Sequence, residues 1–157
     1  MWTGNRSRTD RILAAIEIPA LGLWLGALCG FAFIFAPAAF RIVAPADIAR
    51  FAALTAAALG MLAPAGYIFG GVAIVIALVR SREAGERTFD FTRVLLVLIA
   101  LALVWFESAT IVPAMVATTD FNSAAYHSLH ERSRIVYGTV LVLGLVALVM
   151  AAARKDS

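Results

Sequence analysis

Residues 51–79 read FAALTAAALGMLAPAGYIFGGVAIVIALV, and this run contains no charged side chain. Since about 20 apolar residues cross the hydrocarbon core of a bilayer, the run is long enough to span one. Three more apolar runs, at 12–40, 94–117 and 135–153, have a similar character. They predict an all-α integral membrane protein: a single domain, 1–157, forming a four-transmembrane-helix bundle with helices at approximately 12–40, 46–79, 93–117 and 128–153.

Composition supports a membrane protein and argues against a nucleic-acid-binding one. Apolar residues make up 62% of the chain and the mean hydropathy is +0.91, well above water-soluble domains. The net charge is +3, but the basic residues form short clusters at the ends of apolar runs, as topology determinants do. We therefore expect the lipid bilayer, and no nucleic acid, as a partner. Cys29 is the only cysteine, which excludes an intrachain disulfide, and we interpret it as a packing residue.

Two of the runs need further interpretation. The run at 12–40 exceeds the 7–15 residues of a signal-peptide core, so we interpret it as a retained helix. Pro64 interrupts the run at 51–79 and predicts a kink, with 47–61 partly along the membrane surface and 62–79 crossing. We interpret the charged segment 80–93, RSREAGERTFDFTR, as a simple polar connection.

Lys and Arg residues predict the orientation. The N-terminal arm, the 80–93 connection and the C-terminal residues hold nine of the thirteen, whereas the opposite loops hold Arg41, Arg50, Arg132 and Arg134. By the positive-inside rule, both the N- and C-termini are cytoplasmic. We place the protein in a bacterial inner membrane, with 121–134 at the outer side.

Glycines at helical spacing predict where helices pack closely. The first helix carries a ridge of Gly22, Gly26 and Gly30, and the second carries Gly66 and Gly70. Because small residues allow backbones to approach each other in lipid, we expect these faces to form a seam between the first two helices; a homodimer through one ridge is the alternative. Trp2, Trp24 and Trp105 are interpreted as packing residues or interface anchors.

Two carboxylates fall inside apolar runs, and an intramembrane charge is a site hypothesis by default. Glu17 lies about two turns beyond Arg11, so we expect it to reach the inner interface by snorkelling. Glu107 lies six residues before Pro113, about 9 Å below the outer end of its helix.

The fourth helix supplies possible neighbours for Glu107. His130, Ser133 and Tyr137 are spaced i, i+3, i+7 and line one stripe, with Tyr137 about 10 Å below His130. Glu107 and Tyr137 then lie at similar depth on consecutive helices, and we predict a hydrogen bond or close approach between them. The predicted polar pocket consists of Glu107, His130, Ser133 and Tyr137.

No cofactor is predicted, but the histidines leave a metal or haem open. His127, His130 and Glu131 at i, i+3, i+4 share a face that suits zinc or copper, and His130 would serve as an axial haem ligand if it lay below the interface. With Glu17 and Arg41, His127 and Glu131 are secondary site candidates; Glu131, Arg132 and Arg134 are expected to form an interfacial charge group. No catalytic arrangement is found, because Ser133 and His130 lack a third, orienting group.

Three segments resemble the transmembrane protein 205-like family, also catalogued as domain of unknown function 4149. They are GLWLGALCGFAFIFAPAAFR (Gly22 to Arg41), ESATIVPAM (Glu107 to Met115) and F-x-x-x-x-x-x-x-L-H-x-x-S ending at Ser133. The resemblance covers nearly the whole chain and implies four transmembrane helices, without an established reaction, cofactor or substrate. The family pattern has asparagines where this chain has Glu107 and Tyr137. More distantly, the chain is similar to copper-resistance D-like proteins and the membrane protoporphyrinogen oxidase, a likeness of fold alone.

Three functions remain open. The first is a non-enzymatic membrane module, as a stand-alone bundle or as an accessory subunit that forms a homo-oligomer or binds a membrane-complex partner. The second is a transporter in which Glu107 and Glu17 are two stations of a proton or solute path. The third is a haem or metal protein.

Overall fold

The computed structural model describes residues 8–44, 46–81, 87–118, 120–121 and 123–153, and the regular structure within them is helical. The first span consists of α1 (Arg8–Cys29), the π-helix η1 (Gly30–Phe35) and α2 (Ala36–Val43); the second span is α3 (Ile48–Arg80). The third span consists of α4 (Arg87–Phe106), the π-helix η2 (Glu107–Ile111) and α5 (Val112–Ala117), and the fourth is α6 (Ala124–Ala153). Each span is long and apolar enough to cross a membrane, which confirms the predicted architecture. The third span begins at Arg87, earlier than expected, so 87–93 belongs to α4 and not to a connection.

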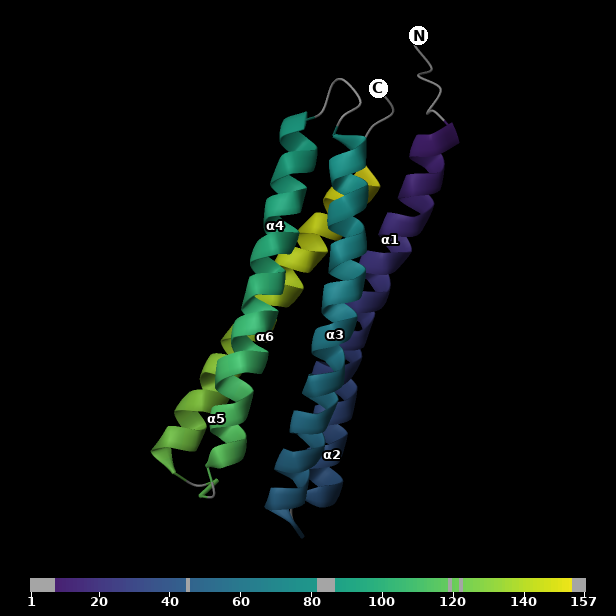
Figure 1. Cartoon of the computed structure of the whole chain (residues 1–157). Helices are drawn as coiled ribbons and strands as arrows, with labels where there is room; N and C mark the ends of the chain where they lie inside the picture. The colour runs from purple at the N-terminus through teal and green to yellow at the C-terminus, as the bar shows by residue number, and fades with distance from the viewer. Residues whose placement is uncertain (1–7, 45, 82–86, 119, 122, 154–157) are drawn as a thin grey trace.

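The four spans form a closed ring in which α1 contacts α3 and α6, and α4 contacts the same two helices. Figure 1 shows the spans side by side and alternating in direction. The start of α1, the end of α3, the start of α4 and the end of α6 lie together at what we term the terminal end. The α2–α3 and α5–α6 connections lie at the opposite, loop end.

Buried residues recur at alternating intervals of three and four along α3 and along α4 with η2. On α4 and η2 they are Asp90, Arg93, Val97, Ala100, Val104, Glu107 and Ile111. On α3 they include Leu59, Ala63, Gly66, Gly70, Ala73, Ala77 and Arg80. An interval averaging 3.5 residues keeps one stripe facing the bundle axis, as in left-handed coiled coils. Charged residues at the ends of these stripes are therefore carried into the bundle together with the apolar ones.

Glycines permit close packing in α3 and α6, whereas those of α1 do not. A Cβ on Gly66 would come 2.9 Å from Trp24 Nε1, and one on Gly70 would come 2.8 Å from Leu101. The ridge Gly22, Gly26 and Gly30 has no neighbouring atom within 4 Å of a Cβ at any of its positions. The first two helices do pack together, but α1 contributes Trp24 to the contact and directs its glycine ridge away from it.

The three tryptophans have different environments. Trp24 is almost fully buried, at 1% exposure, and belongs to the apolar core with Leu21, Leu28, Val97 and Val140. Trp105 is 62% exposed, a position suited to contact with lipid, and Trp2 lies outside the described residues. Cys29 is partly buried.

Both π-helices precede a proline. Pro37 lies in the first turn of α2 and Pro113 in the first turn of α5, directly after η1 and η2. A proline inside a helix clashes with the carbonyl four residues earlier and offers no N–H, and a wider turn accommodates both effects. Toward the loop end, α2 and the start of α3 form one pair and α5 and the start of α6 another (Figure 1). Pro64 lies inside the continuous helix α3.

Candidate functional site

Five charged side chains meet at the terminal end of the bundle, and we refer to Asp10, Glu17, Arg80, Asp90 and Arg93 as the charge cluster. Arg80 donates from Nε to Asp10 Oδ1 at 2.6 Å and from Nη1 to Glu17 Oε2 at 2.8 Å. Arg93 Nη2 lies 3.1 Å from Glu17 Oε1 and 3.0 Å from Asp90 Oδ1. Glu17 on α1 thereby pairs with arginines of both α3 and α4.

The cluster is buried as deeply as the apolar core. Glu17, Arg80 and Asp90 are fully buried and Arg93 is 1% exposed. Removing charges from water costs several kcal/mol for each ion, and this cost is offset only where opposite charges and hydrogen bonds replace the water. Removal of one member would therefore leave the others buried without compensation.

The charge cluster corrects two sequence-based expectations. Glu17 does not snorkel to the interface but points into the bundle, because two guanidinium groups there supply the opposite charge. Arg80, Asp90 and Arg93, assigned to a polar connection, lie at the ends of α3 and α4 and are buried. Sequence spacing offered a signal that was missed: Asp10 and Glu17 are seven residues apart, two helical turns along one face.

A second polar group surrounds Glu107, and we refer to Glu107, Ser133, Tyr137, Tyr67 and Ser108 as the Glu107 layer. Glu107 and Ser133 are buried, whereas Tyr67 is 39% exposed. Ser133 Oγ on α6 donates to Glu107 Oε1 at 2.5 Å, and Glu107 is fully buried. Tyr67 on α3 lies with its hydroxyl 3.5 Å from Ser108 Oγ. Glu107 follows Arg93 by 14 residues on one continuous span, about 21 Å along the helix.

The predicted polar pocket is assembled only in part. Glu107 and Ser133 are in direct contact, as members of a pocket should be. The sequence predicts a hydrogen bond or close approach between Glu107 and Tyr137. Tyr137, one turn further along α6, packs against the core and lies within electrostatic range of Glu107, while the hydrogen bond shown at Glu107 comes from Ser133. Ser133 is closer to the loop end than Tyr137, so it meets the third span at the depth of Glu107. His130 is exposed and its ring stacks on Tyr126, with centroids 6.3 Å apart, so it points away from the pocket.

Apart from Glu17, which is buried in the charge cluster, the secondary candidates lie on the surface. His127, Glu131 and Arg41 are exposed, as are Arg132 and Arg134. His127 contacts the edge of the Tyr126 ring. Among the described residues, no group of three or more His, Cys, Asp or Glu side chains lies close enough together to hold a metal ion. The haem and metal hypotheses therefore gain no support from the position of either histidine.

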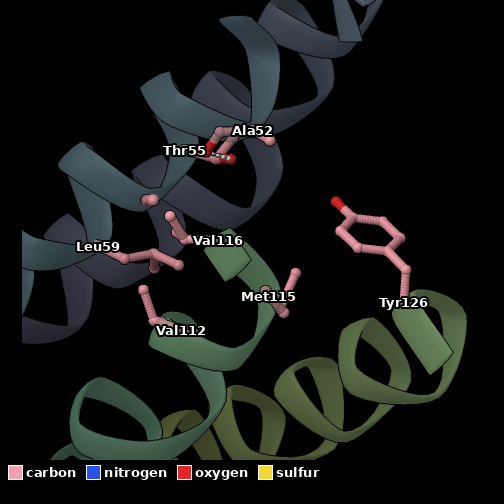
Figure 2. Close-up of a pocket in the computed structure, with 8 residues that line it drawn as sticks. Ala52, Thr55, Leu59, Val112, Met115, Val116 and Tyr126 are labelled. Atoms are coloured by element: carbon pink, nitrogen blue, oxygen red, sulfur yellow. Dashed lines mark hydrogen bonds between the residues drawn. The ribbon is translucent and has the colours of Figure 1, made fainter. Parts of the chain in front are cut away.

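A small pocket lies between α3, α5 and the start of α6 near the loop end (Figure 2). It is lined by Ala52, Thr55, Ala56, Leu59, Val112, Met115, Val116 and Tyr126. Tyr126 stands across it from Thr55, with its hydroxyl directed toward α3. The volume of about 30 Å³ is enough for one water molecule. Val112, at its inner side, donates its backbone N–H to the Glu107 carbonyl, so the pocket lies next to the Glu107 layer.

A second pocket is lined mainly by apolar side chains. It has a volume of about 270 Å³ and lies between the third span and α6, lined by Phe106, Thr110, Ile111, Ala114, Leu129, Arg132, Ile135 and Val136. The apolar lining of this pocket is suited to contact with a hydrocarbon chain.

The chain matches no family model, no curated protein and no solved structure. The chemistry must therefore be argued from its own residues. The charge cluster can hold helices together, and the Glu107 layer can bind or release a proton.

Proposed function

We propose that this protein is a non-enzymatic integral membrane module, a rigid four-helix bundle that acts as an accessory subunit in a membrane assembly. The observation that carries the proposal is the position of Glu17, which pairs with Arg80 of α3 and Arg93 of α4. One carboxylate thereby joins three of the four spans. This pairing holds the three spans together, because each carboxylate oxygen of Glu17 lies beside a guanidinium group.

A proton or solute path that uses Glu17 as a station is less well supported. A path station must change its charge or release its ligand, whereas Glu17 lies 2.8 and 3.1 Å from two buried guanidinium groups. Neutralising it would leave those groups buried without this partner, which is energetically costly.

The proposed orientation has the terminal end in the cytoplasm and the loop end outside. The terminal end carries most of the Lys and Arg residues, in agreement with the positive-inside rule. Under this orientation the charge cluster lies near the inner interface and the Glu107 layer in the outer half of a bacterial inner membrane.

Membership of the transmembrane protein 205-like family is part of the proposal. Two of the resembling segments, Gly22 to Arg41 and Glu107 to Met115, each combine a π-helix with the proline that follows it. The third segment ends at Ser133, which donates to Glu107. The resembling residues are thus those that shape the outer half of the bundle.

The outward ridge of Gly22, Gly26 and Gly30 is the face on which we expect another membrane helix, either a second copy or another subunit. Small residues let a helix approach closely in lipid, where apolar side chains give little drive for association. A Cβ at Gly26 meets no atom of this chain, so the ridge is accessible to a partner.

Native electrophoresis after mild solubilisation tests the proposal. We expect a band well above the 16.7 kDa chain and its loss in Gly26→Ile, because a branched side chain separates the two backbones. Gly138→Ile is the matched control, since Gly138 is also exposed and also meets no atom within 4 Å. A monomeric wild-type protein that carries protons into liposomes would overturn the proposal in favour of transport.

A further inference from the structure

One oxygen of Glu107 has no hydrogen-bond partner. Oε1 accepts from Ser133, whereas Oε2 is buried without a partner among the described residues. The whole side chain is fully buried, in the middle part of a span that is apolar on either side. Buried polar atoms without a partner are rare and indicate a bound species or a special protonation state.

The surroundings of Glu107 contain hydroxyl groups and no charge. The facing titratable group on α6 is Tyr137, and Tyr67 of α3 lies near Tyr137 and Ser108. None of the ion pairs among the described residues involves Glu107, which accepts a hydrogen bond from Ser133 and lies within electrostatic range of Tyr137. A carboxylate in such a place would lack both water and a counter-ion, and a buried carboxyl in that situation takes up a proton instead.

We propose that Glu107 is a proton-binding site: a neutral carboxylic acid inside the membrane, positioned by Ser133. This inference goes beyond the proposed mechanical role and does not depend on it. The site binds a single proton at Oε2 and is distinct from Glu17, whose two oxygens face arginines.

An apolar carbodiimide tests the proposal, since it enters membranes and reacts with protonated carboxyl groups. The carboxylic O–H adds across one C=N bond: an O–C bond forms and the proton moves to nitrogen. The acyl group then shifts from oxygen to nitrogen and gives a stable N-acylurea. No atom is lost, so the adduct adds the mass of one reagent molecule.

The experiment treats the protein in membranes with dicyclohexylcarbodiimide and maps the adduct by peptide mass spectrometry. We expect the adduct on Glu107 and none on Glu17, which is an internal control because it is equally buried but ion-paired. Glu107→Gln should abolish the adduct. An adduct on Glu17, or an unlabelled Glu107 in the folded protein, overturns the proposal.

Two further measurements keep the test decisive. If sodium ions slow the labelling of Glu107 at constant pH, the site binds a metal cation and the proposal of a proton site is wrong. Infrared spectroscopy provides a readout without any reagent: the carbonyl stretch of a neutral carboxylic acid should be present, shift in D2O and disappear in Glu107→Gln. Absence of this band in the wild-type protein contradicts the proposal.

Discussion

Glu17 and Glu107 are the same residue type, are both fully buried and both lie on the inward stripe of a span. Glu17 meets two guanidinium groups, whereas Glu107 meets one serine hydroxyl. Burial is therefore not what distinguishes them. The chemistry of a buried carboxyl is decided by the neighbours that its helix face brings to it, and this chain contains both outcomes. Glu107 lies about 21 Å along the third span from Arg93, a partner of Glu17.

The two regions also differ in how their helices are held. At the terminal end, α1, α3 and α4 are joined by charged contacts. At the loop end, α2 and η1 contain no buried residue, and a single hydroxyl–carboxyl contact joins the third span to α6 at Glu107. We expect the terminal end to be the more stable half of the bundle.

The largest effect is expected from Glu17→Gln. This change leaves Arg80 and Arg93 buried beside a neutral amide, and breaking a buried pair costs about 3–5 kcal/mol. Glu107→Gln should cost roughly 1 kcal/mol, because an amide oxygen still accepts from Ser133. Denaturation of the purified variants, followed by circular dichroism, measures both; equal costs would remove the distinction between the two regions.

Gly66→Ala tests whether the helices between the two regions are as tightly packed as the structure indicates. The new methyl group would lie 2.9 Å from Trp24 Nε1, and overpacking of this kind costs about 1–3 kcal/mol. Gly26→Ala is the matched control because no atom lies within 4 Å of the new Cβ. We expect it to be neutral or slightly stabilising, since Ala favours helix over Gly by up to about 1 kcal/mol.

A double-mutant cycle separates pairing from simple burial at the charge cluster. Glu17→Gln combined with Arg93→Gln should cost less than the sum of the single changes, by about 0.5–3 kcal/mol. The reason is that Arg93→Gln removes a buried cation that Glu17→Gln has already left without its carboxylate partner. Glu107→Gln with Arg93→Gln serves as the control and should be additive, because these side chains lie far apart.

Ser133→Ala is expected to have the smallest effect. It removes the hydrogen bond to Glu107 Oε1 and should destabilise the protein by about 1 kcal/mol. Thr139→Ala is the control, since the exposed Thr139 hydroxyl donates to the Ile135 carbonyl of its own helix and lies outside the Glu107 layer. If Ser133→Ala cost as much as Glu17→Gln, the Glu107 layer would be a structural element equal to the charge cluster.

The spans could be predicted from the sequence because each is a long apolar run. Two residues named for the polar pocket, Glu107 and Ser133, and two glycines named for packing, Gly66 and Gly70, are buried. Depth along the helix brought Glu107 close to the correct level of α6. Depth did not identify Ser133 as the hydrogen-bond partner of Glu107. A helix rotates by about 100° per residue, so depth alone does not indicate which side chain points toward the neighbouring helix.

The charge cluster was not predicted because its members were interpreted one at a time. Arg80 and Arg93 lie at the ends of apolar runs, where basic residues usually act as topology determinants. Their burial can be predicted only by extending the three- and four-residue spacing of the buried apolar positions to these charged residues. The spacing Asp90, Arg93, Val97, Ala100 was present in the sequence. The outward direction of the α1 glycine ridge was not predicted, because glycine spacing identifies a helix face but not the neighbour that this face meets.

The pairing of Glu17 has a consequence for the order of events during synthesis. Arg80 follows Glu17 by 63 residues, and Arg93 comes later still. When the first helix enters the bilayer, its carboxylate has no cation to meet and is held near the interface, as expected for the isolated segment. Its pairs can form only after the second and third spans have been inserted, so Glu17 stays without them until three of the four spans of a newly made chain are in place.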